Sequence, residues 1–254
     1  MSRTVVVTGS ASGIGKATAA ILAQSGSRVI GVDLHDAEVV TDLGTTDGRQ
    51  QLVEGIRAIA GDRIDAVFAC AGVLAAGAST LAINYFGVVA TLEGLRPLLG
   101  RGNQPRAVTI ASLASLAPDV DQELVELCLR GDEGAALVHA QEKSGGVYSS
   151  SKAALARWVR RTAIRPEWAG SGILLNAVAP GLINTPMTQG IINDLATKVD
   201  FQQYFSRPIG RYGRPEEVAH LLHFLGSPEN SFMLGQVTFI DGGGEATHRG
   251  DQIW

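Results

Sequence analysis

Residues 4–15, TVVVTGSASGIG, decide the fold. A run of valines predicts a strand that is buried on both faces. Gly9, Gly13 and Gly15 follow this strand, and a helical pattern begins near Ile14. Glycines at such a turn let backbone N–H groups approach a pyrophosphate, which the positive end of the helix stabilises. The stretch therefore predicts the first βα unit of a dinucleotide-binding fold rather than an ordinary tight turn.

Strand-like and helical patterns alternate along the rest of the chain, as they do in a parallel sheet covered by helices. Expected strands cover residues 4–9, 28–33, 65–72, 107–112, 173–181 and 236–243, and expected helices cover residues 14–25, 47–60, 80–99, 149–168 and 215–226. No internal repeat, low-complexity tract or linker interrupts this order. We therefore predict an α/β protein in which residues 1–254 form a single Rossmann domain, a doubly wound parallel sheet flanked by helices.

Composition and charge limit the kinds of partner. The chain is 45% hydrophobic and 18% charged, which is typical of a globular protein. Its net charge of -4 gives no reason to expect nucleic acid or an anionic membrane as a partner. The sequence shows no signal-peptide pattern and no apolar run long enough to span a membrane, so we expect a cytoplasmic protein. His220 and His223 are three residues apart but lack a third ligand nearby, so we expect no metal site.

Asp33 ends the second expected strand, 18 residues after Gly15. A carboxylate at this place accepts hydrogen bonds from the adenine ribose hydroxyls, and its charge repels a 2′-phosphate. Two like charges about 4 Å apart repel each other by roughly 4 kcal/mol at an effective dielectric constant of about 20. Ser10, Leu34 and His35 bring no arginine or lysine to reverse this choice. We predict NAD rather than NADP as the cofactor.

A second motif lies in residues 145–155, GGVYSSSKAAL. Tyr148 and Lys152 are four residues apart near the start of an expected helix, so their side chains share one face. Such a pair often arises by chance, and its meaning depends on the rest of the chain.

Together these motifs resemble those of the classical short-chain dehydrogenase/reductase family, over essentially the whole chain. The family pattern TGxxxGxG matches residues 8–15, and Tyr-x-x-x-Lys matches Tyr148 and Lys152. The resemblance places the catalytic serine at Ser112 in TIASLAS and the active-site asparagine at Asn84 in INYFG. It implies an oxidoreductase whose catalytic residues are Asn84, Ser112, Tyr148 and Lys152.

The resemblance also assigns a cofactor site. It places residues 179–186, APGLINTP, at the nicotinamide, with Ile183 and Thr185 at the carboxamide, and it places Asp42 and Leu43 at the adenine. The cofactor-binding residues expected in this way are Gly9, Ser12, Gly13, Ile14, Gly15, Asp33, Leu34, Asp42, Leu43, Cys70, Ala71, Gly72, Tyr148, Lys152, Pro180, Gly181, Ile183 and Thr185.

Cys70 departs from the family pattern. The family has Asn-Asn-Ala-Gly after its fourth strand, whereas residues 69–72 read ACAG. We interpret Cys70 as a small buried hydrophobic residue rather than a reactive thiol.

A second departure is an insertion at residues 117–145. Ser112 and Tyr148 are 36 residues apart, about two dozen more than in the family. The extra segment carries apolar residues at helical spacing, Val120, Leu124, Leu127 and Cys128. We expect one or two added amphipathic helices here. The insertion resembles the bacterial 3α-hydroxysteroid dehydrogenase/carbonyl reductase subgroup, and because the ordinary family builds its tetramer from this region, we expect a homodimer.

Residues 182–212 are expected to form a lid over the substrate. The apolar residues of this segment are Met187, Ile191, Ile192, Leu195, Phe201, Tyr204 and Phe205. They suit a mobile cover for a hydrophobic substrate, or equally a pair of amphipathic helices packed against the body. No arginine cluster is present to hold a carboxylate or phosphate. We expect a steroid or bulky alicyclic alcohol, with a smaller alicyclic or aromatic ketone as the alternative.

Two other classes of protein share parts of this pattern. Sugar-nucleotide epimerases and dehydratases share the Tyr and Lys pair but resemble a longer chain with a C-terminal substrate domain, which the few residues after position 243 do not supply. A non-catalytic NAD-binding sensor would be expected to have lost a catalytic residue, and all four are present. The sequence leaves open whether the tail ATHRGDQIW covers the substrate or reaches a second subunit.

Overall fold

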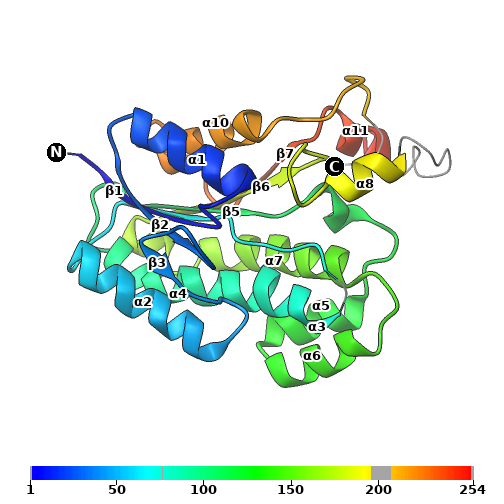
Figure 1. The fold of residues 1–254 in the computed structure, drawn as a ribbon, viewed down its shortest axis with the longest axis horizontal. Helices are drawn as coiled ribbons and strands as arrows, with labels where there is room; N and C mark the ends of the chain where they lie inside the picture. Colours follow the sequence, from blue (N-terminus) through cyan, green and yellow to red (C-terminus); the bar gives the residue numbers. More distant parts are fainter. Residues whose placement is uncertain (1, 76, 196–206, 253–254) are drawn as a thin grey trace.

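The computed structural model describes residues 2–75, 77–195 and 207–252 (Figure 1). These residues form one seven-stranded parallel sheet with the strand order β3-β2-β1-β4-β5-β6-β7. The strands are β1 (Thr4–Thr8), β2 (Arg28–Asp33), β3 (Val39–Val40), β4 (Ala66–Ala69), β5 (Arg106–Ile110), β6 (Leu174–Pro180) and β7 (Val237–Ile240). The predicted α/β fold with a doubly wound parallel sheet is confirmed.

The sheet winds outward from β1 in both directions, with β2 and β3 on one side and β4 to β7 on the other. In such sheets ligands bind beyond the carboxyl ends of the strands where the winding reverses. This places a binding crevice beside the ends of β1 and β4. The two-residue strand β3 was not predicted, because so short a run leaves no recognisable pattern.

Helices cover both faces of the sheet (Figure 1). One face is covered by α1 (Gly13–Gln24) and α10 (Pro215–Gly226), and the other by α2 (Thr46–Ala60), α4 (Val88–Leu99) and α7 (Val147–Ala163). The alternation of side chains along β1 supplies both cores: Val6 belongs to the apolar cluster on the α4 side, whereas Val5 and Val7 belong to the cluster on the α10 side.

Two of the expected helices differ in detail. The helix expected at 149–168 is α7, which ends at Ala163, because Pro166 disfavours helical geometry in the residue before it. The helix expected at 80–99 is three segments: α3 (Ala78–Leu81), the π-helix η1 (Ala82–Gly87) and α4. The apolar pattern of these residues carries no signal that separates a π-turn from an α-turn.

The insertion is helical, as the sequence predicts. It forms α5 (Gln122–Arg130) and α6 (Glu133–Gln141), joined at Gly131, whose left-handed φ of 75° ends α5. Asp121 and Asp132 cap the two helices by accepting hydrogen bonds from the Leu124 and Ala135 N–H groups. Leu124 is fully buried against the body of the protein, and α5 packs on α7.

Short elements complete the carboxyl end of the sheet. They are the 3₁₀ helix η2 (Leu113–Leu116), the helix α8 (Gln189–Leu195) in the expected lid segment, and α11 (Gly244–Arg249), which packs against η2. The 3₁₀ helix η3 (Ala169–Ser171) instead precedes β6 and lies at the amino end of the sheet. Phe201, Tyr204 and Phe205 of the expected lid lie outside the described residues, as does the end of the tail. Within the described ranges, no helix has the length and apolar character needed to cross a membrane.

Candidate active site

The turn after β1 requires glycine at two positions. Gly9 has a φ of 70°, and its N–H donates to the Val32 carbonyl at 2.8 Å. A methyl group on Gly15 would lie 2.0 Å from the Gly9 carbonyl oxygen, so only glycine lets α1 begin this close to the turn. As a result, the first residues of α1 reach a cavity at the carboxyl edge of the sheet.

This cavity has a volume of about 340 Å³. Every residue that the sequence assigned to the cofactor lines it, from the glycine turn to Thr185. Further lining residues that the sequence did not assign to the cofactor are Val32, His35, Thr41, Val73, Ile83, Ile110 and Ala111. Pro186 of the expected nicotinamide loop also lines the cavity, as do Met187 and Thr188 of the expected lid segment. Most of these residues are next to assigned residues in the sequence, so the same loops bring them to the cavity. A glycine-rich helix N-terminus beside a long cavity fits a dinucleotide.

Asp33 is held at one end of the cavity. Its Oδ2 accepts a hydrogen bond from the Ala11 N–H at 2.9 Å, and its Oδ1 accepts one from the Leu34 N–H at 2.7 Å. These contacts fix the carboxylate beside the glycine turn. Lys152, on α7, is the only lysine or arginine among the described residues that line the cavity.

Tyr148 and Lys152 lie at the other end of the cavity with Ser112. Lys152 is 4% exposed, donates from Nζ to the Ile110 carbonyl at 2.8 Å, and lies 5.8 Å from the centroid of the Tyr148 ring. Burial lowers the pKa of Lys152 to about 8. Burial also raises the pKa of Tyr148 above 10.0, and a hydrogen bond with Ser112 offsets part of that rise. The helix spacing therefore does bring the phenol and the amine together.

Asn84 lies behind this group rather than on the cavity wall. It is fully buried in η1, where its Oδ1 accepts from the Val73 N–H at 2.8 Å and its Nδ2 donates to the Val73 carbonyl at 2.9 Å. A methyl group on Gly72 would lie 3.2 Å from Asn84 Oδ1 and 3.7 Å from Lys152 Nζ. Because Gly72 has no side chain, the Asn84 amide and the Lys152 ammonium can both approach this position.

Cys70 lies at the end of β4, next to the cofactor cavity. The residue is partly buried rather than fully buried. Burial of its sulfur raises the pKa of the thiol to about 12, which favours the protonated form. This environment favours the interpretation of Cys70 as a small packing residue.

A second cavity, of about 380 Å³, opens on the same catalytic groups. It shares Ser112, Tyr148, Gly181, Met187 and Thr188 with the first cavity. Its other walls are mainly apolar and include Leu74, Leu113, Leu116, Leu182 and Ile191. The two cavities therefore meet at the Ser112 and Tyr148 hydroxyls, and a group bound in one would face a group bound in the other.

The tail contributes to the second cavity. His248, on α11, is one of its lining residues, together with Asp119 at the start of the insertion. His248 belongs to the tail whose role the sequence left open, and Asp119 belongs to the expected insertion. The sequence singled out neither residue, because α11 approaches η2 only through the tertiary fold. Of the expected lid residues, Met187 and Ile191 line this cavity.

Two family models together match most of the chain. The model described as short chain dehydrogenase matches residues 3–123, and the one described as enoyl-(acyl carrier protein) reductase matches residues 135–245. The chain therefore belongs to the short-chain dehydrogenase/reductase family and is an oxidoreductase of the kind that binds a nicotinamide cofactor. The gap between the two matches falls inside the helical insertion.

Particular relatives are similar over nearly the full length. A 3-alpha-hydroxysteroid dehydrogenase/carbonyl reductase of Comamonas testosteroni is 36% identical over 98% of this chain and 99% of its own. A cis-4-hydroxycyclohexanecarboxylate dehydrogenase of Sinomonas cyclohexanicum is 32% identical over 95% of this chain and 96% of its own. Among solved structures, the 3-alpha-hydroxysteroid dehydrogenase from Pseudomonas sp. B-0831 complexed with NADH is 39% identical and superposes with a TM-score of 0.92, covering 98% of this chain and 99% of that one.

Proposed function

We propose that the protein interconverts a secondary alcohol and a ketone, using NAD and acting on a hydrophobic substrate such as a 3α-hydroxysteroid. The observation that carries this proposal is the meeting of two cavities at Ser112 and Tyr148. One cavity has the residues expected of a dinucleotide site, and the other is mainly apolar. A carbinol bound in the second cavity would thus lie against both the catalytic hydroxyls and the cofactor.

In the oxidation direction, Tyr148 takes the proton of the substrate hydroxyl, and Ser112 donates a hydrogen bond that fixes the same oxygen. When bound beside Tyr148, NAD would supply a positive charge that favours the phenolate and would serve as the acceptor of the carbinol hydride. A phenol pKa near 7 requires roughly 4 kcal/mol of stabilisation of the phenolate. Since burial acts in the opposite direction, this stabilisation must come from positive charge beside the ring. Among the described residues, Lys152 is one source, with its Nζ 5.8 Å from the ring centroid.

The proposed preference for NAD rests on Asp33. Its carboxylate is held at the cavity by two backbone N–H groups, and no described lysine or arginine lines that end. A 2′-phosphate would therefore meet an uncompensated negative charge. The relative complexed with NADH adds support from similarity.

The proposed substrate class rests on the second cavity. Its volume lies within the range of about 300–1,000 Å³ that is usual for sites of small organic ligands. Its described lining contains Asp119 but no lysine or arginine, which disfavours a substrate anchored by a carboxylate or phosphate. A smaller alicyclic or aromatic alcohol is the second candidate. The similarity to a cis-4-hydroxycyclohexanecarboxylate dehydrogenase supports the alicyclic ring alcohol, whereas the carboxylate of that compound has no lysine or arginine partner in the described lining.

We also propose a homodimer. The helix α5 covers part of α7, where Arg157 donates to the Gln122 side chain at 2.9 Å and approaches Glu126 at 3.8 Å. The face of α7 that carries Arg157 is therefore already in contact within the chain, and a second copy must use another surface.

Steady-state assays of NADH or NADPH formation test the proposed activity. NAD⁺ and NADP⁺ would be supplied separately, each with androsterone, cyclohexanol and 1-phenylethanol. We expect turnover with NAD⁺ and the highest kcat/KM for the steroid. A preference for the small alcohols would keep the reaction and change the substrate class. Activity with NADP⁺ alone would contradict the role given to Asp33.

A further inference from the structure

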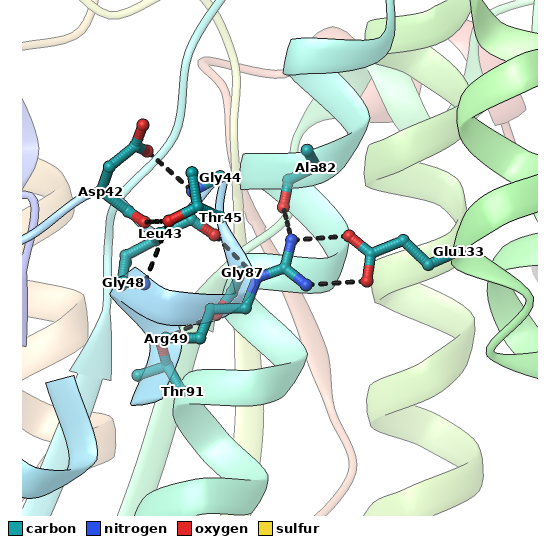
Figure 2. A network of polar contacts seen from close by, with 10 residues as sticks. All are labelled: Asp42, Leu43, Gly44, Thr45, Gly48, Arg49, Ala82, Gly87, Thr91 and Glu133. Atoms are coloured by element: carbon teal, nitrogen blue, oxygen red, sulfur yellow. Dashed lines mark hydrogen bonds and ion pairs between the residues drawn. The ribbon is translucent and has the colours of Figure 1, made fainter. Parts of the chain in front are cut away.

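The guanidinium of Arg49 lies at the centre of a polar network that joins three parts of the chain (Figure 2). On the body of the protein, its Nε donates to the Leu43 carbonyl at 2.8 Å and its Nη2 donates to the Ala82 carbonyl at 2.9 Å. On the inserted helix α6, Glu133 accepts from Nη1 at 2.8 Å and from Nη2 at 2.7 Å. The planar fork of arginine satisfies these partners together, which a lysine cannot do.

The Leu43 carbonyl belongs to a turn that forms part of the cofactor cavity. Asp42 and Leu43 both line that cavity. Within the turn, Asp42 Oδ1 accepts from the Gly44 N–H at 2.8 Å, and Thr45 Oγ1 donates to the Asp42 carbonyl at 3.0 Å while it caps α2. Each of these bonds is local to the turn, whereas Arg49 connects the turn to the rest of the protein.

Leu43 lies on the side of the cavity away from the catalytic residues. The turn follows β3 at one edge of the sheet, whereas Ser112 follows β5, and three strands separate β3 from β5. A dinucleotide with its nicotinamide at Tyr148 must therefore place its other nucleotide beside Leu43 and Asp33. The turn is a wall for the adenosine half of the cofactor.

The π-helix η1 packs closely against this wall. A methyl group on Gly87 would lie 2.8 Å from the Leu43 carbonyl oxygen, so the backbones are in direct contact there. Arg49 bridges the same two segments through Leu43 and Ala82 (Figure 2). Glu133 balances the charge of Arg49 at this bridge. Solvent does little of this work, because the Arg49 side chain is only 11% exposed and that of Glu133 is 34% exposed.

We propose that Arg49 and Glu133 are positioning residues through which the inserted helix α6 fixes the adenosine wall of the cofactor cavity. The inference rests on the proposed function, because it assumes that a dinucleotide occupies this cavity. Without Glu133, Arg49 would be a poorly solvated cation with two carbonyl partners, and it would turn toward solvent. Leu43 would then lose its hydrogen-bonded link to η1 and keep only the packing contact with Gly87, so the wall would become less ordered.

The test is isothermal titration of NADH and of ADP-ribose, which has the adenosine half without the nicotinamide, into the full-length protein. Glu133→Ala is the main variant, because it contacts neither the cavity nor Leu43. We expect both ligands to bind about threefold to tenfold more weakly than to the wild type. We expect kcat at saturating NAD⁺ to stay within about twofold of the wild type, so that the loss falls on KM for NAD⁺.

Ala140→Gly is the matched control. It removes a buried methyl group near the far end of the same helix and lowers the stability of that helix, and it lies seven positions after Glu133 in the sequence. Equal losses of ADP-ribose affinity in the two variants would overturn the proposal, since helix stability alone would explain them. Unchanged ADP-ribose affinity in Glu133→Ala would also overturn it.

Two further variants test the same contact. If Glu133→Ala fails to fold, Glu133→Gln keeps the shape of the side chain and is expected to give a smaller loss in the same direction. Arg49→Lys, which keeps the charge but cannot reach all three partners, is expected to match or exceed the loss in Glu133→Ala. A wild type that binds neither NADH nor ADP-ribose would refute the proposed function itself, whereas normal wild-type binding with unaffected variants would refute only the positioning role.

Discussion

At the scale of single residues, Lys152 combines burial with charge. Its amine is 4% exposed and has one carbonyl partner within hydrogen-bond distance, Ile110. The pKa of about 8 means that the folded protein holds this proton less tightly than the unfolded chain, in which the pKa is near 10.5. The unfolded state therefore binds more protons between these two values, and stability rises with pH across that window.

The variant Lys152→Met tests this residue. Below pH 8 the buried ammonium lowers wild-type stability by roughly 3 kcal/mol. This figure follows from the fall in the Lys152 pKa from 10.5 to about 8, at about 1.4 kcal/mol for each pH unit. The free energy of unfolding of Lys152→Met minus that of the wild type should therefore fall by roughly this amount between about pH 7 and pH 10.5. Urea unfolding of both proteins without cofactor, at a series of pH values, measures the difference. A difference that does not change with pH would show that Lys152 titrates normally.

At the scale of elements, the turn after β1 and the inserted helix α6 differ in whether a glycine can be replaced by a larger residue. Gly15 has no room for a side chain, whereas a methyl group on Gly134, in α6, would meet nothing within 4 Å. We expect Gly15→Ala to destabilise the protein by about 1–3 kcal/mol and to weaken NADH binding. We expect Gly134→Ala to stabilise it by about 0.5 kcal/mol, with NADH binding unchanged. Thermal unfolding and NADH titration of both variants check this pair, and a tolerated alanine at position 15 would contradict the close contact with Gly9.

The elements also show what sequence patterns can predict. The strands and the Tyr148 and Lys152 pair depend on local spacing, so the sequence located them. The break in the helix expected at 80–99 coincides with close packing of η1 against the Leu43 turn, a tertiary contact that no local pattern records. The contact of Arg49 with Glu133 joins residues 84 positions apart, so it too belongs to the tertiary fold.

At the scale of the whole molecule, the order of the strands decides the arrangement of the site. Because all the strands are parallel and the winding reverses between β1 and β4, the loops after β1, β2, β4, β5 and β6 lie along one edge of the sheet. The cofactor residues could be assigned from the sequence because family motifs lie on these loops. The sequence left the role of the tail open, and the position of His248 follows only from the packing of α11 in the assembled fold.

The proposed homodimer belongs to this scale as well. Size-exclusion chromatography with light scattering is expected to give twice the chain mass of 26.6 kDa. A tetramer would show that the inserted helices do not prevent the assembly that the ordinary family forms. A monomer would also contradict the proposal.

The most direct test of the account compares wild type and Tyr148→Phe with NAD⁺ and androsterone, together with a titration of NADH into each. We predict turnover by the wild type, a fall in kcat of about 10²–10⁴-fold in the variant, and NADH affinity that is nearly the same in both. This result would assign the proton transfer to Tyr148. Near-native turnover by Tyr148→Phe would contradict the central claim.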